Sequence, residues 1–119
     1  MAPFHQHVEI GPRDGSRFQM VIAQVGTSST YTLVPAAVLT MLGVAPEWTQ
    51  TLERASGEQE EHQLAEVRIR LNGQERTAPC VFGEPGSEPV LGAHTLLSFG
   101  LAVDAANQRL VAATLLQGQ

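Results

Sequence analysis

Alternating apolar and polar positions recur along this chain and predict several short strands. In residues 4–10, FHQHVEI, the side chains of Phe4, Gln6, Val8 and Ile10 share one face of a strand, and three of them are apolar. Residues 17–25, RFQMVIAQV, form a second run of this kind. The sequence GPRDG lies between them and has the composition of a turn, so we expect a hairpin with a loop of about five residues.

The middle of the chain predicts two further hairpins. Residues 48–73 are expected to form a long hairpin that turns at Ser56-Gly57, followed by a separate strand. Residues 67–71 alternate cleanly up to Asn72-Gly73, the strongest short-range hairpin signal in the chain, and a strand returns through residues 79–82. Residues 101–116 predict two short strands about an Ala-Asn turn.

Two segments have the spacing of short helices. Pro35 precedes AAVLTMLG, where Leu39 and Leu42 repeat at i and i+3 and Gly43 occupies the position of a C-terminal cap. Residues 90–100 run from a short apolar strand through a glycine into a second helix that ends at Gly100. The whole pattern predicts a mostly β barrel or sandwich with two small helices, in one domain over residues 1–119.

Composition excludes several classes of function. The chain has 119 residues and a net charge of −5, with seven arginines and no lysine, which argues against nucleic-acid binding. It has no apolar run of about 18 residues, so we expect no membrane-spanning helix. Its N-terminus has no signal pattern, and we expect a cytoplasmic protein. The single cysteine, Cys80, lies in an apolar strand and is expected to be a buried structural thiol.

The stretch AQVGTSSTYTLVP, residues 23–35, joins an apolar strand to a polar turn and then to the first helix. LG and ASG follow it, and the passage VLGAHTLLSFGLAVD comes later, with RL four residues beyond. In this order the motifs resemble the retropepsin-like aspartic proteases, in particular their small single-domain bacterial and archaeal members. The resemblance covers nearly the whole chain, and the C-terminal passage is its most specific part.

The resemblance implies a fold and an assembly. The fold is an all-β, retropepsin-like closed barrel with one or two short helices. Each chain supplies half of an active site and a flap, and two chains form a homodimer around a peptide cleft. In this chain the resemblance places the dimer contacts at the termini and at the turn 26–29, and the flap tip at Ser56-Gly57.

The catalytic turn of that family reads Asp-Thr-Gly followed by a small residue. These positions fall on Gly26, Thr27, Ser28 and Ser29, so the aspartate is missing. An aspartic protease needs two carboxylates that share one proton, one acting as base on water and the other as acid toward the substrate carbonyl. Glycine can do neither, and we expect no catalytic residue in this turn.

Other carboxylates are poor substitutes. The two aspartates are Asp14, in the first predicted turn, and Asp104, which matches a structural aspartate of the family's C-terminal motif. Glu58 and Glu60 lie near the predicted flap tip and could reach over a cleft, but a mobile flap positions a catalytic group poorly.

The leading hypothesis is therefore a catalytically silent aspartic-protease-like protein whose cleft binds a peptide or a partner protein through Gly26, Thr27, Ser28, Ser29, Ser56 and Gly57. One alternative is a retropepsin-type endopeptidase whose active turn is altered in this sequence. Another is a plain homodimerisation module. No cofactor is implied. His5 and His7 have a spacing that suits a metal but lack a third ligand nearby, so we expect exposed strand histidines and no metal site, and we expect His94 on the surface.

Overall fold

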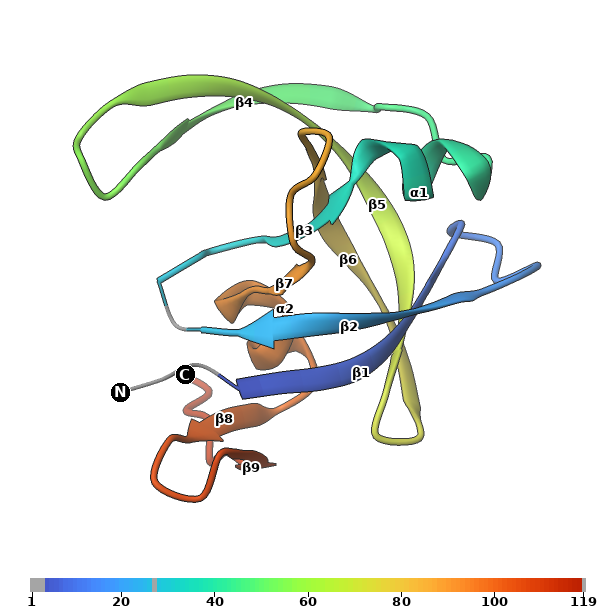
Figure 1. Ribbon diagram of the computed structural model, residues 1–119. Coiled ribbons are helices and arrows are strands. Elements are labelled where there is room, and N and C mark those ends of the chain that lie inside the picture. The colour runs from blue at the N-terminus through green and yellow to red at the C-terminus, as the bar shows by residue number, and fades with distance from the viewer. Residues whose placement is uncertain (1–3, 27, 119) are drawn as a thin grey trace.

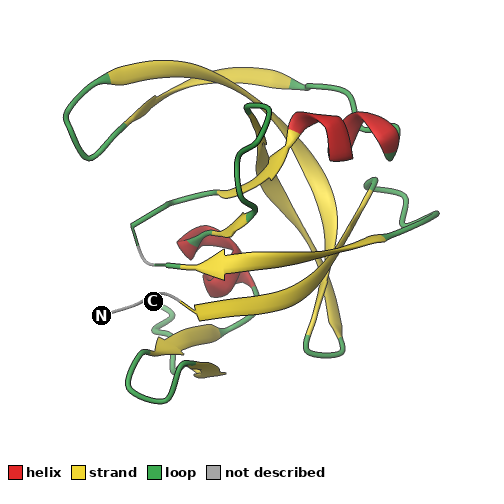
Figure 2. Cartoon of the chain, viewed as in Figure 1, coloured by secondary structure: helices red, strands yellow, loops and turns green. Residues whose placement is uncertain are grey.

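The computed structural model describes residues 4–26 and 28–118, and over these residues most of the chain is β structure with two short helices (Figure 2). In chain order the elements are β1 (Phe4–Gly11), β2 (Gln19–Val25), β3 (Thr32–Pro35), α1 (Ala36–Met41), β4 (Trp48–Glu53), β5 (Gln59–Leu71), β6 (Gln74–Gly83), β7 (Val90–Leu91), α2 (Ala93–Ser98), β8 (Leu101–Asp104) and β9 (Arg109–Ala112). The predicted mostly β composition is confirmed. No helix in this part of the chain is long and apolar enough to cross a membrane.

Within the described residues, one sheet contains seven strands in the order β1-β2-β7-β3-β6-β5-β4, and β8 and β9 pair separately (Figure 1). The short strand β7 lies between β2 and β3, parallel to the first and antiparallel to the second. Strand β3 is parallel to β6. The end of β1, residues 9–11, also pairs with β5. Strand β5 therefore contacts its two sequence neighbours, β4 and β6, and also β1, which is far from it in the sequence.

Two sequence predictions differ from the structure in detail. The loop between β1 and β2 covers residues 12–18, longer than expected, because β2 begins only at Gln19. The separate strand expected after the long hairpin is wrong, since residues 59–71 form one continuous strand. Its first half pairs with β4 and its second half with β6, so one strand serves two hairpins.

The predicted turn at Asn72-Gly73 is confirmed. Both residues have positive φ, 50° for Asn72 and 76° for Gly73, as the tight turns of two-residue hairpins require. This turn sets the register that places Leu71 opposite Gln74 and Ile69 opposite Arg76. The apolar face of β5 is thereby directed into the core.

The core lies between the curved sheet and the two helices. Buried side chains from most of the strands and from both helices form it, among them Val8, Ile10, Val25, Val34, Leu39, Val67, Ile69, Leu71, Leu91 and Leu96. Strands β8 and β9 are attached to this core by three partly buried side chains, Leu101, Val103 and Leu110. The alternation of buried and exposed positions on β1 and β5 is the one that the sequence predicts.

The side chain of Cys80 is fully buried in β6, as expected. Burial raises the pKa of the thiol to about 12, so at pH 8 the reactive thiolate is almost absent. We expect the folded protein to resist a thiol reagent such as DTNB and to react once urea unfolds it. The absorbance of the released thiol anion measures both rates. Labelling of the folded protein as fast as free cysteine would contradict this.

Candidate functional site

The polar turn after β2 rests on the N-terminus of α2. The backbone N–H of Ala93 donates to the carbonyl oxygen of Ser29 at 2.9 Å, and that of His94 donates to Thr30 at 2.8 Å. The first turn of a helix leaves such N–H groups without partners inside the helix. Here the polar turn supplies the acceptors, which fixes the turn against α2.

A pair of buried threonines joins the same two segments. The hydroxyls of Thr32, on β3, and Thr95, on α2, lie 2.6 Å apart, and both side chains are buried. The N–H of Gly92 donates to the Thr32 hydroxyl at 3.1 Å. A Cβ added at Gly92 would lie 2.7 Å from the backbone nitrogen of Thr32 and still closer to the carbonyl group of Tyr31. Glycine is therefore required for β3 and α2 to approach this closely.

A cleft of about 460 Å³ separates this turn from the hairpin β4–β5. The turn contributes Ser28, Ser29, Thr30 and Tyr31, the hairpin contributes Leu52, Glu53, Arg54, Ala55, Glu60 and His62, and three apolar side chains complete it, Leu33, Val81 and Val90. The lining is thus hydroxyl-rich on one side, charged on the other and apolar between them. This is the composition of a site for a ligand with both polar and apolar groups.

The residues expected to form the catalytic turn are only partly in the described structure. Ser28 and Ser29 line the cleft, whereas Thr27 lies outside the described residues. Gly26 ends the connection from β2, and a Cβ added to it would have the Ser28 hydroxyl oxygen, at 3.9 Å, as its nearest neighbour. A Cβ at position 26 would therefore be in ordinary van der Waals contact.

Ser56 and Gly57 lie at the tip of the hairpin β4–β5. Gly57 has a φ of 90°, its N–H donates to the carbonyl of Arg54, and the N–H of Arg54 donates to Glu58. The tip itself does not contribute to the cleft lining, which ends at Ala55 on this side. The structure therefore brings the hairpin to the turn through residues next to the predicted tip.

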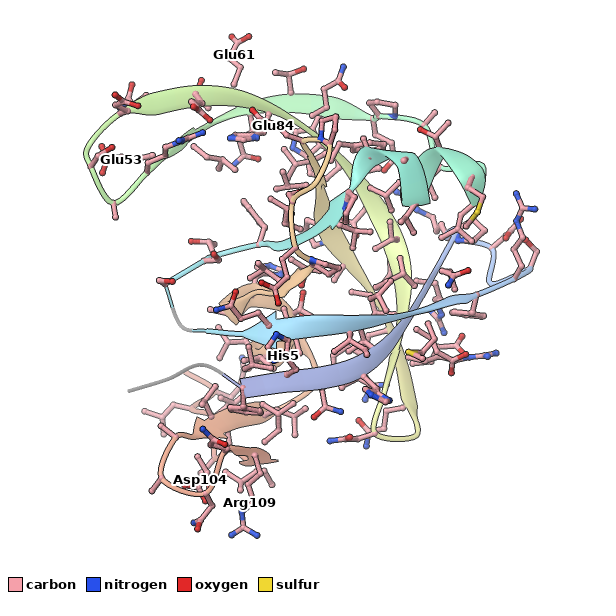
Figure 3. The ribbon with its side chains drawn as sticks, viewed as in Figure 1. His5, Glu53, Glu61, Glu84, Asp104 and Arg109 are labelled. Atoms are coloured by element: carbon pink, nitrogen blue, oxygen red, sulfur yellow. The ribbon has the colours of Figure 1, made fainter. Side chains whose placement is uncertain are left out.

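Of the two carboxylates that line the cleft, Glu53 and Glu60, the one with ion-pair partners among the described residues is Glu60. One of its oxygens lies 2.6 Å from Arg54, and the other lies 3.3 Å from Nε2 of His62. Both oxygens are thus occupied within the hairpin. Glu58 is exposed and is not part of the cleft lining. Glu61 points away from the body of the molecule (Figure 3).

The two aspartates lie elsewhere. Asp14 accepts a hydrogen bond from the N–H of Ser16 in the first loop. Asp104 closes the turn between β8 and β9, where Asn107 and Arg109 donate to it at 2.9 and 3.2 Å (Figure 3). These bonds, chiefly the one from Asn107, lower the pKa of the Asp104 carboxyl. Asp104 thus joins the two ends of the β8–β9 turn.

The hydrogen bonds that link the hairpin to the turn were not predicted from the sequence. The indole of Trp48 donates to the side-chain oxygen of Gln50 at 3.0 Å, and the Gln50 amide donates to the Tyr31 hydroxyl at 3.2 Å. The Tyr31 ring lies 5.8 Å from that of His94, centre to centre. Only the alternation of β4 could have placed Trp48 and Gln50 on one face.

The other sequence candidates lie outside the cleft. His5 pairs with Glu88 at 2.6 Å, and His7 is exposed. Over the described ranges, no group of three or more histidine, cysteine, aspartate or glutamate side chains is placed to hold a metal ion. A second cavity, of about 310 Å³, lies at the Asn72-Gly73 end, where Arg70 is already paired with Glu75.

No family model matches this sequence, and a comparison with curated proteins finds no match.

Proposed function

We propose that this chain is a retropepsin-like domain without catalytic carboxylates, which binds an extended peptide segment of a ligand or partner protein in the cleft and does not cleave it. The observation that carries the proposal is the cleft itself. It lies between the turn that contains Ser28 and Ser29 and the hairpin β4–β5, where the resemblance expects a peptide site. Gly26 stands in this turn where the family has its aspartate.

Strand order supports the fold that the proposal assumes. The turn leaves β2 and returns as β3, and β7 inserts between these two strands. The additional pairing of β1 with β5 brings distant parts of the sheet together, as a closed barrel needs. We include the closed retropepsin-like barrel in the proposal on these grounds.

The chemistry of the cleft favours binding over hydrolysis. The turn offers hydroxyl groups, which have no suitable acidity to replace a carboxylate. The Glu60 carboxylate is bound by Arg54 and lies beside His62, so it is not available to activate water. An extended peptide could form hydrogen bonds with Ser28 and Ser29 and apolar contacts with Leu33. Such contacts are sufficient for binding and do not require a catalytic group.

We include a homodimer in the proposal, formed through the termini and the turn 26–29. Leu115 and Leu116 near the C-terminus are 51% and 97% exposed, and exposed apolar side chains of this size often mark a contact surface. Two copies would then form one longer cleft.

A binding experiment tests the function. We expect a pool of peptides from a digested unfolded protein to shift the NMR amide signals of residues 28–31 and 52–62, and the bound peptides to be recovered intact. Leu52→Arg should weaken binding at least about tenfold, because it replaces an apolar side chain of the cleft lining by a charged one. Thr51→Arg adds the same charge at an exposed position on the same strand and should leave binding unchanged.

Equal binding by both variants would show that the peptides bind elsewhere. Shifts confined to residues outside 28–31 and 52–62 would have the same meaning. The absence of any binding by the wild-type protein would favour the plain dimerisation module.

A further inference from the structure

The hairpin β4–β5 is tied to the polar turn through one side chain. Gln50 lies on β4, opposite His62 on β5, and is half-buried. Its amide group uses both ends, since the oxygen accepts from the Trp48 indole and the nitrogen donates to the Tyr31 hydroxyl. In the described part of the chain, this last bond is the one side-chain hydrogen bond between the hairpin and residues 28–31.

Tyr31 is held from two sides. Its hydroxyl receives the Gln50 amide, and its ring lies near that of His94 on α2. Because Tyr31 also lines the cleft, a ligand that contacts its ring lies beside the bond to Gln50. The hydrogen bond between Gln50 and Tyr31 therefore links the position of the hairpin to the binding of a ligand in the cleft.

We propose that the hydrogen bond from the Gln50 amide to the Tyr31 hydroxyl holds the hairpin over the cleft, and we call this bond the latch. The indole of Trp48 orients the Gln50 amide by donating to its oxygen. On the tip side of Leu64, residues 49–53 and 59–63 pair only with each other, because β6 pairs with β5 only from Leu64 to Leu71. Once the latch opens, this part can leave the turn and its cross-strand pairs can separate, which is the local unfolding that proteolysis detects. That the latch controls ligand entry rests on the proposed function, whereas its effect on the free hairpin does not.

The sequence provides a specific reporter of hairpin opening. The chain contains no lysine, and Arg54 is the one arginine between Arg17 and Arg68. It lies where β4 ends, beside the hairpin tip. Trypsin cleavage after Arg54, which yields residues 1–54 and 55–119, therefore measures opening in this hairpin. Where opening and closing are faster than cleavage, the rate follows the population of the open form.

The experiment compares four proteins without ligand: wild type, Tyr31→Phe, Gln50→Leu and Gln63→Leu. Tyr31→Phe removes only the oxygen that Gln50 contacts. Gln63→Leu makes the same change as Gln50→Leu at an exposed position of β5 in the same hairpin. Circular dichroism and urea unfolding establish that each variant is folded.

We expect Tyr31→Phe and Gln50→Leu each to raise the rate of cleavage after Arg54 about fivefold, the factor that one neutral hydrogen bond contributes. Gln63→Leu should cleave at the wild-type rate. Combining Tyr31→Phe with Gln50→Leu should add little, because both remove the same bond. If Gln50→Leu does not fold, the comparison of Tyr31→Phe with Gln63→Leu decides.

Cleavage of Tyr31→Phe at the wild-type rate would overturn the latch, and so would an equal increase in Gln63→Leu. Neither result depends on whether a peptide binds. A protein that shows the latch effect but binds no peptide would contradict the proposed function and leave the latch in place.

Discussion

We expect Gly92→Ala to lower the free energy of unfolding by about 3 kcal/mol, at the upper end of the cost of overpacking a well-filled interior. The added Cβ would lie 2.7 Å from the nitrogen of Thr32 and closer still to the carbonyl group of Tyr31. These are backbone atoms, which cannot rotate away as a flexible side chain does. Relieving the clash requires β3 and α2 to separate.

Such a separation would also break the hydrogen bonds around the turn. The bond from Gly92 to Thr32 and the contact between Thr32 and Thr95 are both buried, so their loss leaves polar groups without partners. We therefore expect the polar turn to be displaced in any Gly92→Ala protein that still folds. Its amide signals should differ from those of the wild type.

Gly26→Ala is the matched control. It is also a glycine-to-alanine change in this part of the fold, but its nearest neighbour would be the Ser28 oxygen at an ordinary 3.9 Å. We expect it to change the free energy of unfolding by less than about 0.5 kcal/mol. Urea unfolding, followed by the fluorescence of Trp48, the one tryptophan, measures both variants. Equal losses in the two would contradict the role assigned to Gly92.

Local patterns were sufficient to predict most elements of the fold. The turn at Asn72-Gly73 and the glycine at the end of α1, Gly43 with a φ of 82°, depend on the conformations of a few adjacent residues, and both agree with the structure. The continuous strand β5 was not predicted as one element. Ser56-Gly57 correctly marked a turn, but nothing local shows that one strand pairs with two partners.

The lining of the cleft could not be predicted from the pattern of apolar and polar residues alone. Ser28 and Ser29 were expected near a hairpin because of the resemblance, and they line the same cleft as Leu52 and Arg54. The bond from Gln50 to Tyr31 joins positions in separate elements. Period-two alternation indicates which residues share a face, but the partner of that face depends on the long-range order of the strands.

The largest change in activity is expected from the double variant Gly26→Asp with Ser28→Gly. In the family that this sequence resembles, the turn carries Asp-Thr-Gly, and the double change restores that pattern around Thr27. A Cβ at position 26 is not crowded, since its nearest atom is the Ser28 hydroxyl oxygen at 3.9 Å, which the second change removes.

Restoring an acid–base group should raise the rate of peptide cleavage at least about 100-fold above the wild-type background. In the proposed homodimer the two new carboxyls would lie close together and share one proton, which separates their pKa values. Only the singly protonated pair has both a base and an acid. We therefore expect cleavage to be fastest at acidic pH and to fall toward neutral pH as the second carboxyl ionises.

The matched control is Gly26→Asn with Ser28→Gly. Asparagine has nearly the shape of aspartate but no ionisable carboxyl, so it tests the chemistry and not the change in packing. We expect this variant to fold and dimerise like the restored one and to remain inactive. Sedimentation velocity measures the oligomeric state of all three proteins.

The central claim is that the chain has a peptide cleft without its carboxylates. Its most direct test is to incubate an unfolded protein substrate with each protein, between about pH 3 and 7, and to look for fragments by mass spectrometry. The proposal predicts fragments from Gly26→Asp with Ser28→Gly, blocked by a transition-state-like peptide inhibitor, and none from the wild type or the asparagine control. Inhibitor-sensitive fragments from the wild type, or a folded and dimeric restored variant that yields none, would contradict it.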